Sequence, residues 1–343
     1  MKKIKKSVKI ITAVVLVIVL LLASGVIFYL SKLNLIKFSD GKFRWNGSID
    51  TNDSETIDEQ SRMNDAIADL EEKDAIDATG KIYKDKRFLN ILLIGTDEHT
   101  ENFSENARGD SCMIMSVGKK DGSLKLASLE RGMGMPILDG KYKGQYDWLT
   151  HTFRYGGADL MMREVRECFK VDVERYIRVN FATFKKGIEA VGGIDIELTA
   201  AEAGYVNEGT GLKKYTAGLN HLDGEAALVY ARCRHIDSDW HRIERQRNVI
   251  QAVVTKTKEL DIAELNGLLN NVLPLVQTNL TRLEITELLL LAPKYRGVEI
   301  KQMTVPVSGS YGGMRGLGGR SLFSVDFETN SRALREFIYG IKN

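Results

Sequence analysis

The sequence predicts a layered α/β domain that follows a single N-terminal transmembrane helix. Two observations carry this prediction. Residues 10–30 form an uninterrupted apolar run, and from residue 87 onward short apolar runs alternate with helical patterns along the 343-residue chain. This alternation favours an α/β or αβα layered arrangement, and residues 87–343 are numerous enough to bury one large core.

Residues 1–30 have the pattern of a membrane anchor that is retained. Residues 10–30 contain no charged side chain, and a helix rising about 1.5 Å per residue spans the ~30 Å hydrocarbon core over this length. Five lysines lie in residues 1–9, so the positive-inside rule places that tail in the cytoplasm and exports the rest of the chain. A cleaved signal peptide is the alternative, but the apolar run is longer than the core of a typical signal peptide.

Residues 31–86 are polar and predict an extracytoplasmic stalk. Acidic residues gather in this segment at Asp50, Asp53, Glu55, Asp58 and Glu59. Their charge disfavours contact with an anionic membrane surface. A short helix is expected near residues 62–72.

The domain over residues 87–343 is expected to begin with three buried strands and to continue mainly with helices. Strands are expected at residues 89–95, 112–117, 124–129, 194–198 and 298–305. Helices are expected at residues 158–169, 181–191, 225–231, 240–260, 262–276 and 282–294. Glycine pairs at 156–157 and 192–193 punctuate these elements, and the second pair is expected to close a helix before a strand.

Net charge and cysteine usage exclude some classes of function. A formal net charge of +2 is too small for bulk attraction to nucleic acid, so no nucleic-acid partner is expected. Cys112, Cys168 and Cys233 are odd in number and lack metal-ligand spacing. We expect them to be buried packing residues, although arginines beside Cys233 raise the alternative of a stabilised thiolate.

The first candidate site lies where two predicted strands meet their loops. Asp97 follows one apolar strand in Gly95-Thr96-Asp97, and Asp110 opens the next strand in Arg108-Gly109-Asp110. Two carboxylates at neighbouring strand ends can converge on one hard cation, and protein-bound Mg²⁺ usually takes one or two carboxylates beside water and substrate phosphate. The pair therefore suits a pyrophosphate substrate with Mg²⁺ or Mn²⁺. The alternative is that both acids only cap loops.

Arginines form the second candidate site. Arg131 ends the third predicted strand and can face the same end of the sheet, and the densest cluster follows later, at Arg232, Arg234, Asp239, Arg242, Arg245, Gln246 and Arg247. In a helix that begins near residue 240, Arg242 and Gln246 share a face, and Asp239 is expected as the N-cap. Arginine's planar fork suits phosphate oxygens, so the cluster favours a phosphate site over a solvated basic helix face, which is the alternative.

These motifs, taken in order, resemble the LytR-CpsA-Psr family. The resemblance runs from about residue 88 to the C-terminus and rests on Gly95-Thr96-Asp97, Arg108-x-Asp110, Ser128-x-x-Arg131, Gly156-Gly157, Val191-Gly192-Gly193, Leu222-x-Gly224-x-x-Ala227, Tyr230-x-Arg232-x-Arg234 and Asp239-x-x-Arg242-x-x-Arg245-Gln246. Several spaced motifs in the right order make the likeness specific. A transmembrane helix before an extracytoplasmic domain is also the usual topology of this family.

The resemblance implies an αβα sandwich with a central mixed sheet and an apolar tunnel for a polyprenyl lipid. It implies an enzyme of the cell membrane of a Gram-positive-type bacterium. Such an enzyme transfers a phosphate-linked glycopolymer, such as wall teichoic acid or capsule, from polyprenyl pyrophosphate to peptidoglycan. Its catalytic residues would be Asp97, Arg108, Asp110, Arg131 and Asp239, with Asp97 and Asp110 as the metal ligands. The pyrophosphate would be bound by Arg108, Arg131, Arg232, Arg234, Arg242 and Gln246.

The sequence departs from the family pattern at two positions. The family commonly has Ser or Thr where this chain has Gly109, and Asp where this chain has Gly132. The second departure removes a carboxylate near the site, which puts the positioning of Arg131 and the preferred substrate in question.

Two other functions remain open. A polyprenyl pyrophosphate hydrolase would use the same metal site with water as the acceptor. A non-catalytic lipid-binding regulator would keep the tunnel without needing Asp97 and Asp110, so the presence of both acids favours catalysis.

Overall fold

The structure is a computed structural model that describes residues 32–42, 54–100, 102–104, 107–234 and 236–341. The predicted tail at residues 1–9 and the predicted transmembrane helix at residues 10–30 lie outside the described residues. Within the part of the chain that the structure describes, no helix is both long enough and apolar enough to cross a membrane.

A seven-stranded sheet runs through the described part of the chain. In spatial order its strands are β1 (Lys37–Phe38), β10 (Gln277–Thr278), β7 (Arg175–Asn180), β2 (Phe88–Thr96), β3 (Gly109–Gly118), β4 (Leu124–Leu129) and β11 (Lys301–Val305). The pairs β1 and β10, β7 and β2, and β4 and β11 are parallel, and the other neighbours are antiparallel. The prediction of a central mixed sheet is confirmed.

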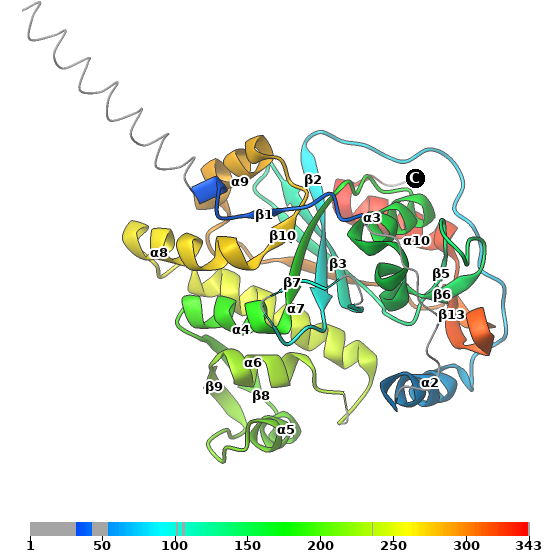
Figure 1. The fold of residues 1–343 in the computed structure, drawn as a ribbon, viewed down its shortest axis with the longest axis horizontal. Helices are drawn as coiled ribbons and strands as arrows, with labels where there is room; N and C mark the ends of the chain where they lie inside the picture. The colour runs from blue at the N-terminus through cyan, green and yellow to red at the C-terminus, as the bar shows by residue number, and fades with distance from the viewer. Residues whose placement is uncertain (1–31, 43–53, 101, 105–106, 235, 342–343) are drawn as a thin grey trace, which may run out of the picture.

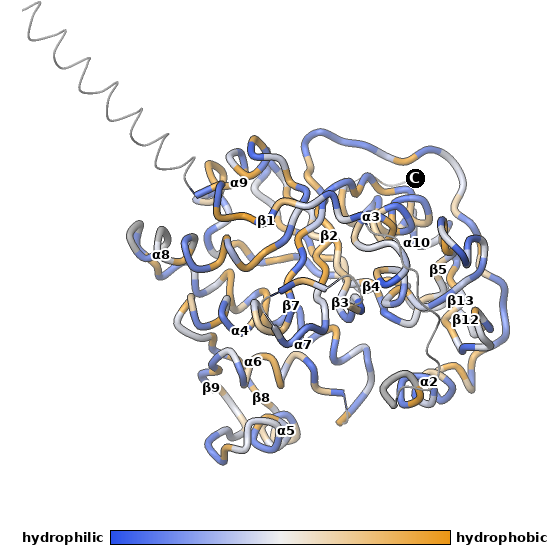
Figure 2. Tube along the Cα trace, in the orientation of Figure 1, coloured by the Kyte–Doolittle hydropathy of each residue, from blue (hydrophilic) through white to orange (hydrophobic). Residues whose placement is uncertain are grey.

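Helices cover both faces of this sheet (Figure 1). Side chains alternate between the faces along a strand, so Leu92 and Ile94 of β2 join one core and Ile91 joins the other. The first core also contains residues of α3 (Leu149–Phe169) and α10 (Phe327–Tyr339). The second contains residues of α7 (Asp239–Lys256) and α9 (Arg282–Tyr295). Figure 2 shows the apolar stretches of β2 and β3 in the middle of the molecule.

Most predicted elements are present, some with shifted bounds. The strands at 89–95, 112–117 and 124–129 are β2, β3 and β4. The helix expected at 158–169 is the second part of α3, which is kinked at Gly156 and Gly157, where the backbone is not helical, as expected for this glycine pair. Gly192 and Gly193 close α4 with φ of 76° and 83°, as expected for a glycine pair that ends a helix. The remaining elements are β5 (Gly134–Pro136), β6 (Tyr146–Trp148), α4 (Phe181–Ala190), β8 (Ile194–Leu198), α5 (Ala200–Thr210), β9 (Gly218–Leu222), α6 (Gly224–Ala231), α8 (Ile262–Val272), η1 (Leu273–Leu275), β12 (Tyr311–Arg315), η2 (Leu317–Gly319) and β13 (Ser321–Val325).

Parts of the predicted stalk pack against the domain. Leu33 and Ile36 are buried in the core on the α7 and α9 face. A helix is expected near residues 62–72, but the observed helix α2 (Ser54–Ile67) begins and ends earlier. It contacts β13 and places Met63 in a cluster with Trp148 and Phe323. The predicted domain boundary near residue 86 stays a prediction, but α2 is close enough to the sheet edge to contribute side chains to it.

Candidate active site

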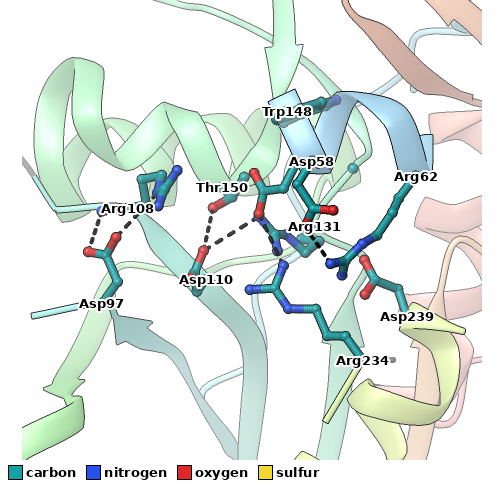
Figure 3. A network of polar contacts seen from close by, with 12 residues as sticks. Asp58, Arg62, Asp97, Arg108, Asp110, Arg131, Trp148, Thr150, Arg234 and Asp239 are labelled. Atoms are coloured by element: carbon teal, nitrogen blue, oxygen red, sulfur yellow. Dashed lines mark hydrogen bonds and ion pairs between the residues drawn. The ribbon is translucent and has the colours of Figure 1, made fainter. Parts of the chain in front are cut away.

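The ends of three neighbouring strands bring the predicted acids and Arg131 together (Figure 3). β3 is antiparallel to both β2 and β4. The C-terminal ends of β2 and β4 therefore lie at the edge where β3 begins, and Asp97, Asp110 and Arg131 meet there. Arg108 is tied to Asp97, because its backbone N–H and its Nε donate hydrogen bonds of 3.0 and 3.2 Å to that carboxylate.

The pKa values of Asp110 and Asp97 are shifted in opposite directions. Asp110 Oδ1 lies 3.5 Å from Arg131 Nη2 and accepts a 3.4 Å hydrogen bond from Thr150 Oγ1. Burial raises the pKa of Asp110, but Arg131 and the other arginines nearby outweigh burial and hold that pKa below its ordinary value. Burial and the neighbouring charge of Asp110 raise the pKa of Asp97. The two acids therefore repel each other, and a divalent cation would relieve that repulsion.

The first turns of α7 supply the next group of site residues. Arg242 is buried, with its Nη2 3.7 Å from Asp239 Oδ2, and burial lowers the pKa of Arg242 to about 10. One turn later, Gln246 Oε1 accepts a 3.0 Å hydrogen bond from Ser111 Oγ. The prediction of Asp239 as the N-cap is wrong, because Ser238 is the N-cap and Asp239 lies in the first turn. There its carboxylate faces Arg242 instead of the backbone.

Arg232 and Arg234 have different surroundings, although both line one cavity. Arg234 is half-buried, and its Nη1 lies 3.3 Å from Glu59 Oε1. Arg232 is exposed, and its guanidinium lies 4.4 Å from the ring centre of Phe181. Arg234 is therefore held among charges, whereas Arg232 rests on an aromatic face.

Two other residues of the arginine-rich segment contribute to the fold. Arg245 is buried and forms ion pairs with Asp237 and Glu202. Cys233 is buried, as are the other two cysteines, which confirms their prediction as packing residues. Burial raises the pKa of Cys233 to about 11 despite the charge of Arg245, so its thiol is not stabilised as a thiolate.

Glu59 is a site residue that the sequence did not reveal. It lies on α2 with 6% of its surface exposed, and its Oε1 forms ion pairs with Arg131 Nη2 and Arg234 Nη1. Burial raises the pKa of Glu59, but Arg131 and the charges around it outweigh burial and leave that pKa below its ordinary value. In the sequence Glu59 is only one member of a group of acidic residues, and such a group is equally expected in a solvent-exposed segment.

Two cavities adjoin this cluster, and Arg234 lines both. One has a volume of about 320 Å³ and lies between the sheet and the helices α4, α6 and α7. Its apolar lining includes Leu93, Met113, Ile177, Phe184, Leu228 and Val249. Its polar lining includes Asp110, Arg232, Arg234, Arg242 and Gln246. The second cavity, of about 470 Å³, is bordered by α2 and the start of α7, and its lining includes Glu59, Glu130, Arg131, Trp148, Trp240 and Tyr311.

The charges of the cluster nearly cancel. Five guanidinium groups act on the acids of the cluster, those of Arg62, Arg108, Arg131, Arg234 and Arg242, and Arg62 is itself paired with Asp58. The five carboxylates are those of Asp58, Glu59, Asp97, Asp110 and Asp239. The cluster therefore offers little net positive charge to a pyrophosphate that binds alone. A divalent cation bound to the pyrophosphate would offset part of its negative charge.

Comparison with known proteins identifies the family. Residues 51–333 match the model of the LytR_cpsA_psr family. The chain belongs to this family. A relative from Enterococcus faecalis, named polyisoprenyl-teichoic acid--peptidoglycan teichoic acid transferase TagU, is 34% identical over 51% of this chain and 56% of its own length. A TagU protein from Bacillus mycoides is 32% identical over 60% of this chain and 64% of its own length. The chain thus covers less than two thirds of either relative.

Solved structures of the family share the fold. TagT with bound octaprenyl pyrophosphate lipid superposes with a TM-score of 0.56 at 20% identity, over 78% of this chain and 97% of that chain. TagT is a protein of Bacillus subtilis. The predicted family and the mixed α/β fold are therefore confirmed.

Gly109, the first departure from the family pattern, has a packing reason. A Cβ at Gly109 would lie 2.8 Å from Met161 Cε and 3.3 Å from Phe153 Cβ, both on α3. Phe153 and the end of the flexible Met161 side chain therefore fill the space beside Gly109, next to Asp110. A serine or threonine at this position would require the Met161 methyl group to move and Phe153 to give way by a few tenths of an ångström.

Proposed function

We propose that this chain transfers a phosphate-linked glycopolymer, either wall teichoic acid, capsule or another secondary polymer, from polyprenyl pyrophosphate to peptidoglycan. The observation that carries the proposal is the cavity of about 320 Å³ with an apolar body and an arginine-lined polar side. A polyprenyl pyrophosphate combines an apolar chain with a strongly anionic head, so one cavity with two such surfaces suits both parts. The names of the TagU relatives and the lipid bound to TagT support the same substrate class.

The transfer depends on positioning and charge neutralisation. An acceptor hydroxyl attacks the phosphorus that carries the sugar and gives its proton to a carboxylate of the site or to water. The bridging P–O bond breaks, and polyprenyl phosphate leaves with the bond's electron pair. Arg131, Arg234 and Arg242 are placed to neutralise this charge, since a guanidinium can contact two phosphate oxygens at once. The cavity of about 470 Å³ has room for the sugar, and Trp240 and Tyr311 in its wall offer aromatic faces.

Asp97 and Asp110 would hold Mg²⁺ or Mn²⁺. They lie at one sheet edge, where burial and the charge of Asp110 raise the pKa of Asp97. Among the described residues, no three His, Cys, Asp or Glu side chains form a metal cluster. Two carboxylates suit Mg²⁺, because this ion usually fills its other positions with water and substrate phosphate. Bound there, the cation would offset negative charge on the pyrophosphate.

The membrane supplies the substrate in this proposal. Residues 10–30 would anchor the enzyme as a single-pass protein, with residues 1–9 in the cytoplasm and the domain outside, where peptidoglycan lies. This topology brings the cavity to the surface from which a membrane-embedded polyprenyl lipid must be taken.

The test uses the full chain purified in detergent with a labelled lipid-linked polymer, Mg²⁺ and wall acceptor. The proposal predicts label on the wall and release of polyprenyl phosphate. Label that is released only as free polymer, with or without acceptor, would identify a hydrolase instead. Bound lipid without turnover would identify a regulator. Mass spectrometry of lipid that co-purifies with the chain would identify the natural donor.

A further inference from the structure

Glu59 occupies a position at the centre of the arginine cluster. Its Oε1 contacts the guanidinium groups of both Arg131 and Arg234, and its Oε2 is buried with no hydrogen-bond partner among the described residues. Arg131 and Arg234 come from different parts of the fold, one after β4 and the other between α6 and α7. One carboxylate therefore fixes the orientation of two arginines that nothing in the sequence links.

The side chain of Met63, one helical turn after Glu59 on α2, lies over Gly132. A Cβ at Gly132 would overlap the methyl group of Met63. Met63 is buried in the cluster with Trp148 and Phe323. This packing holds α2 beside the residue that follows Arg131, and Glu59 on the same helix contacts the guanidinium of Arg131.

We propose that Glu59 is a positioning residue of the active site, which holds Arg131 and Arg234 in the orientation that the departing phosphate requires. This inference rests on the proposed function. A guanidinium has five donors in a planar fork, so an arginine whose orientation is set by a carboxylate can contact a phosphate at the same time. Glu59 is therefore compatible with phosphate binding by both arginines.

The same contacts predict a separation of turnover from binding. Replacing Glu59 by Gln removes one negative charge from a cluster in which acids and arginines balance, so the affinity for an anion should stay the same or increase. The orientation of the two arginines is lost at the same time, and catalysis depends on that orientation. A residue that only stabilised the fold would not produce a lower rate together with undiminished pyrophosphate binding.

The experiment measures kcat for polymer transfer and the Kd for inorganic pyrophosphate with Mg²⁺, on full-length variants in detergent. Glu59→Gln is expected to lower kcat at least tenfold, with a Kd equal to or below that of the wild type. Glu59→Asp retains the charge but withdraws it by one methylene, so a smaller loss of kcat is expected. It also provides a second variant if Glu59→Gln fails to fold.

Two controls separate charge from packing. Ile67→Ala removes apolar contacts of α2 in the cluster with Met63 and leaves Glu59 unchanged, so it should lower Tm and change kcat less than threefold. Asp69→Asn removes an exposed acid just after α2 and should change neither quantity.

The outcomes distinguish this inference from the proposed function. A wild-type chain that transfers no polymer would refute the function. A wild-type chain that transfers, together with a Glu59→Gln variant of unchanged kcat, would refute only the role of Glu59. Equal losses of kcat in Glu59→Gln and Ile67→Ala would reduce Glu59 to a contributor to the stability of α2.

Discussion

Replacing Arg234 by Lys should impair transfer far more than replacing Arg232 by Lys, although both changes preserve charge. Arg234 is half-buried between the two cavities and 3.3 Å from Glu59. A lysine there cannot reproduce planar contacts to a carboxylate and to phosphate oxygens. A hydrogen bond to a charged group contributes about 1.5–3 kcal/mol, and about 1.4 kcal/mol corresponds to a tenfold rate change. We therefore expect kcat to fall roughly ten- to a hundredfold.

Arg232 provides the matched comparison. It is exposed and rests on Phe181 with 4.4 Å between the guanidinium and the ring centre. An exposed cation–π contact contributes about 0.5–1 kcal/mol, and lysine keeps part of it. Arg232→Lys should therefore lower kcat by no more than roughly two- to fivefold.

The assay is transfer of a labelled polymer from a synthetic lipid pyrophosphate to wall acceptor, with thermal melts to show that both variants are folded. Equal rates in the two lysine variants would contradict the reasoning, because the structure gives the two arginines different surroundings. Wild-type rates in both would remove this segment from the pyrophosphate site and favour the lipid-binding regulator.

Asp97→Ala with Asp110→Ala should abolish Mg²⁺ binding, measured by calorimetry with a pyrophosphate lipid analogue, because both protein ligands are lost; unchanged binding would mean that the acids only cap loops. Burial and the charge of Asp239 raise the pKa of Glu130 from 4.5 to about 7. The native state then holds a proton that the unfolded state releases, so stability should fall as the pH rises from about 4.5 to about 7; Glu130→Gln should flatten this part of a Tm profile, and an unaltered profile would argue against it. Protease added to intact protoplasts should remove the domain over residues 87–343, and a protected or secreted domain would contradict the topology.

The central strands were predictable because the residues of each strand by themselves indicate that it is buried. β2, β3 and β4 are short apolar runs bounded by turn residues, and a strand buried on both faces has that pattern. The pattern was weaker elsewhere. The strand β7 carries Arg175 and Arg178, and α10 begins after a segment rich in glycine. Their burial comes from neighbours distant in the sequence, such as the contact of α10 with α3, so local pattern did not reveal them.

Local sequence patterns are enough to place three of the candidate residues at one end of the sheet. Asp97, Asp110 and Arg131 each lie at the end of a recognisable strand, and adjacent antiparallel strands place those ends side by side. Which of these charges pair depends on contacts between segments that are distant along the chain. Glu59 is 72 positions away from Arg131 and reaches it because α2 packs against β13 and the cluster around Trp148. The pairing of charges depends on distance in space and on burial, and a run of acidic residues in a polar segment encodes neither.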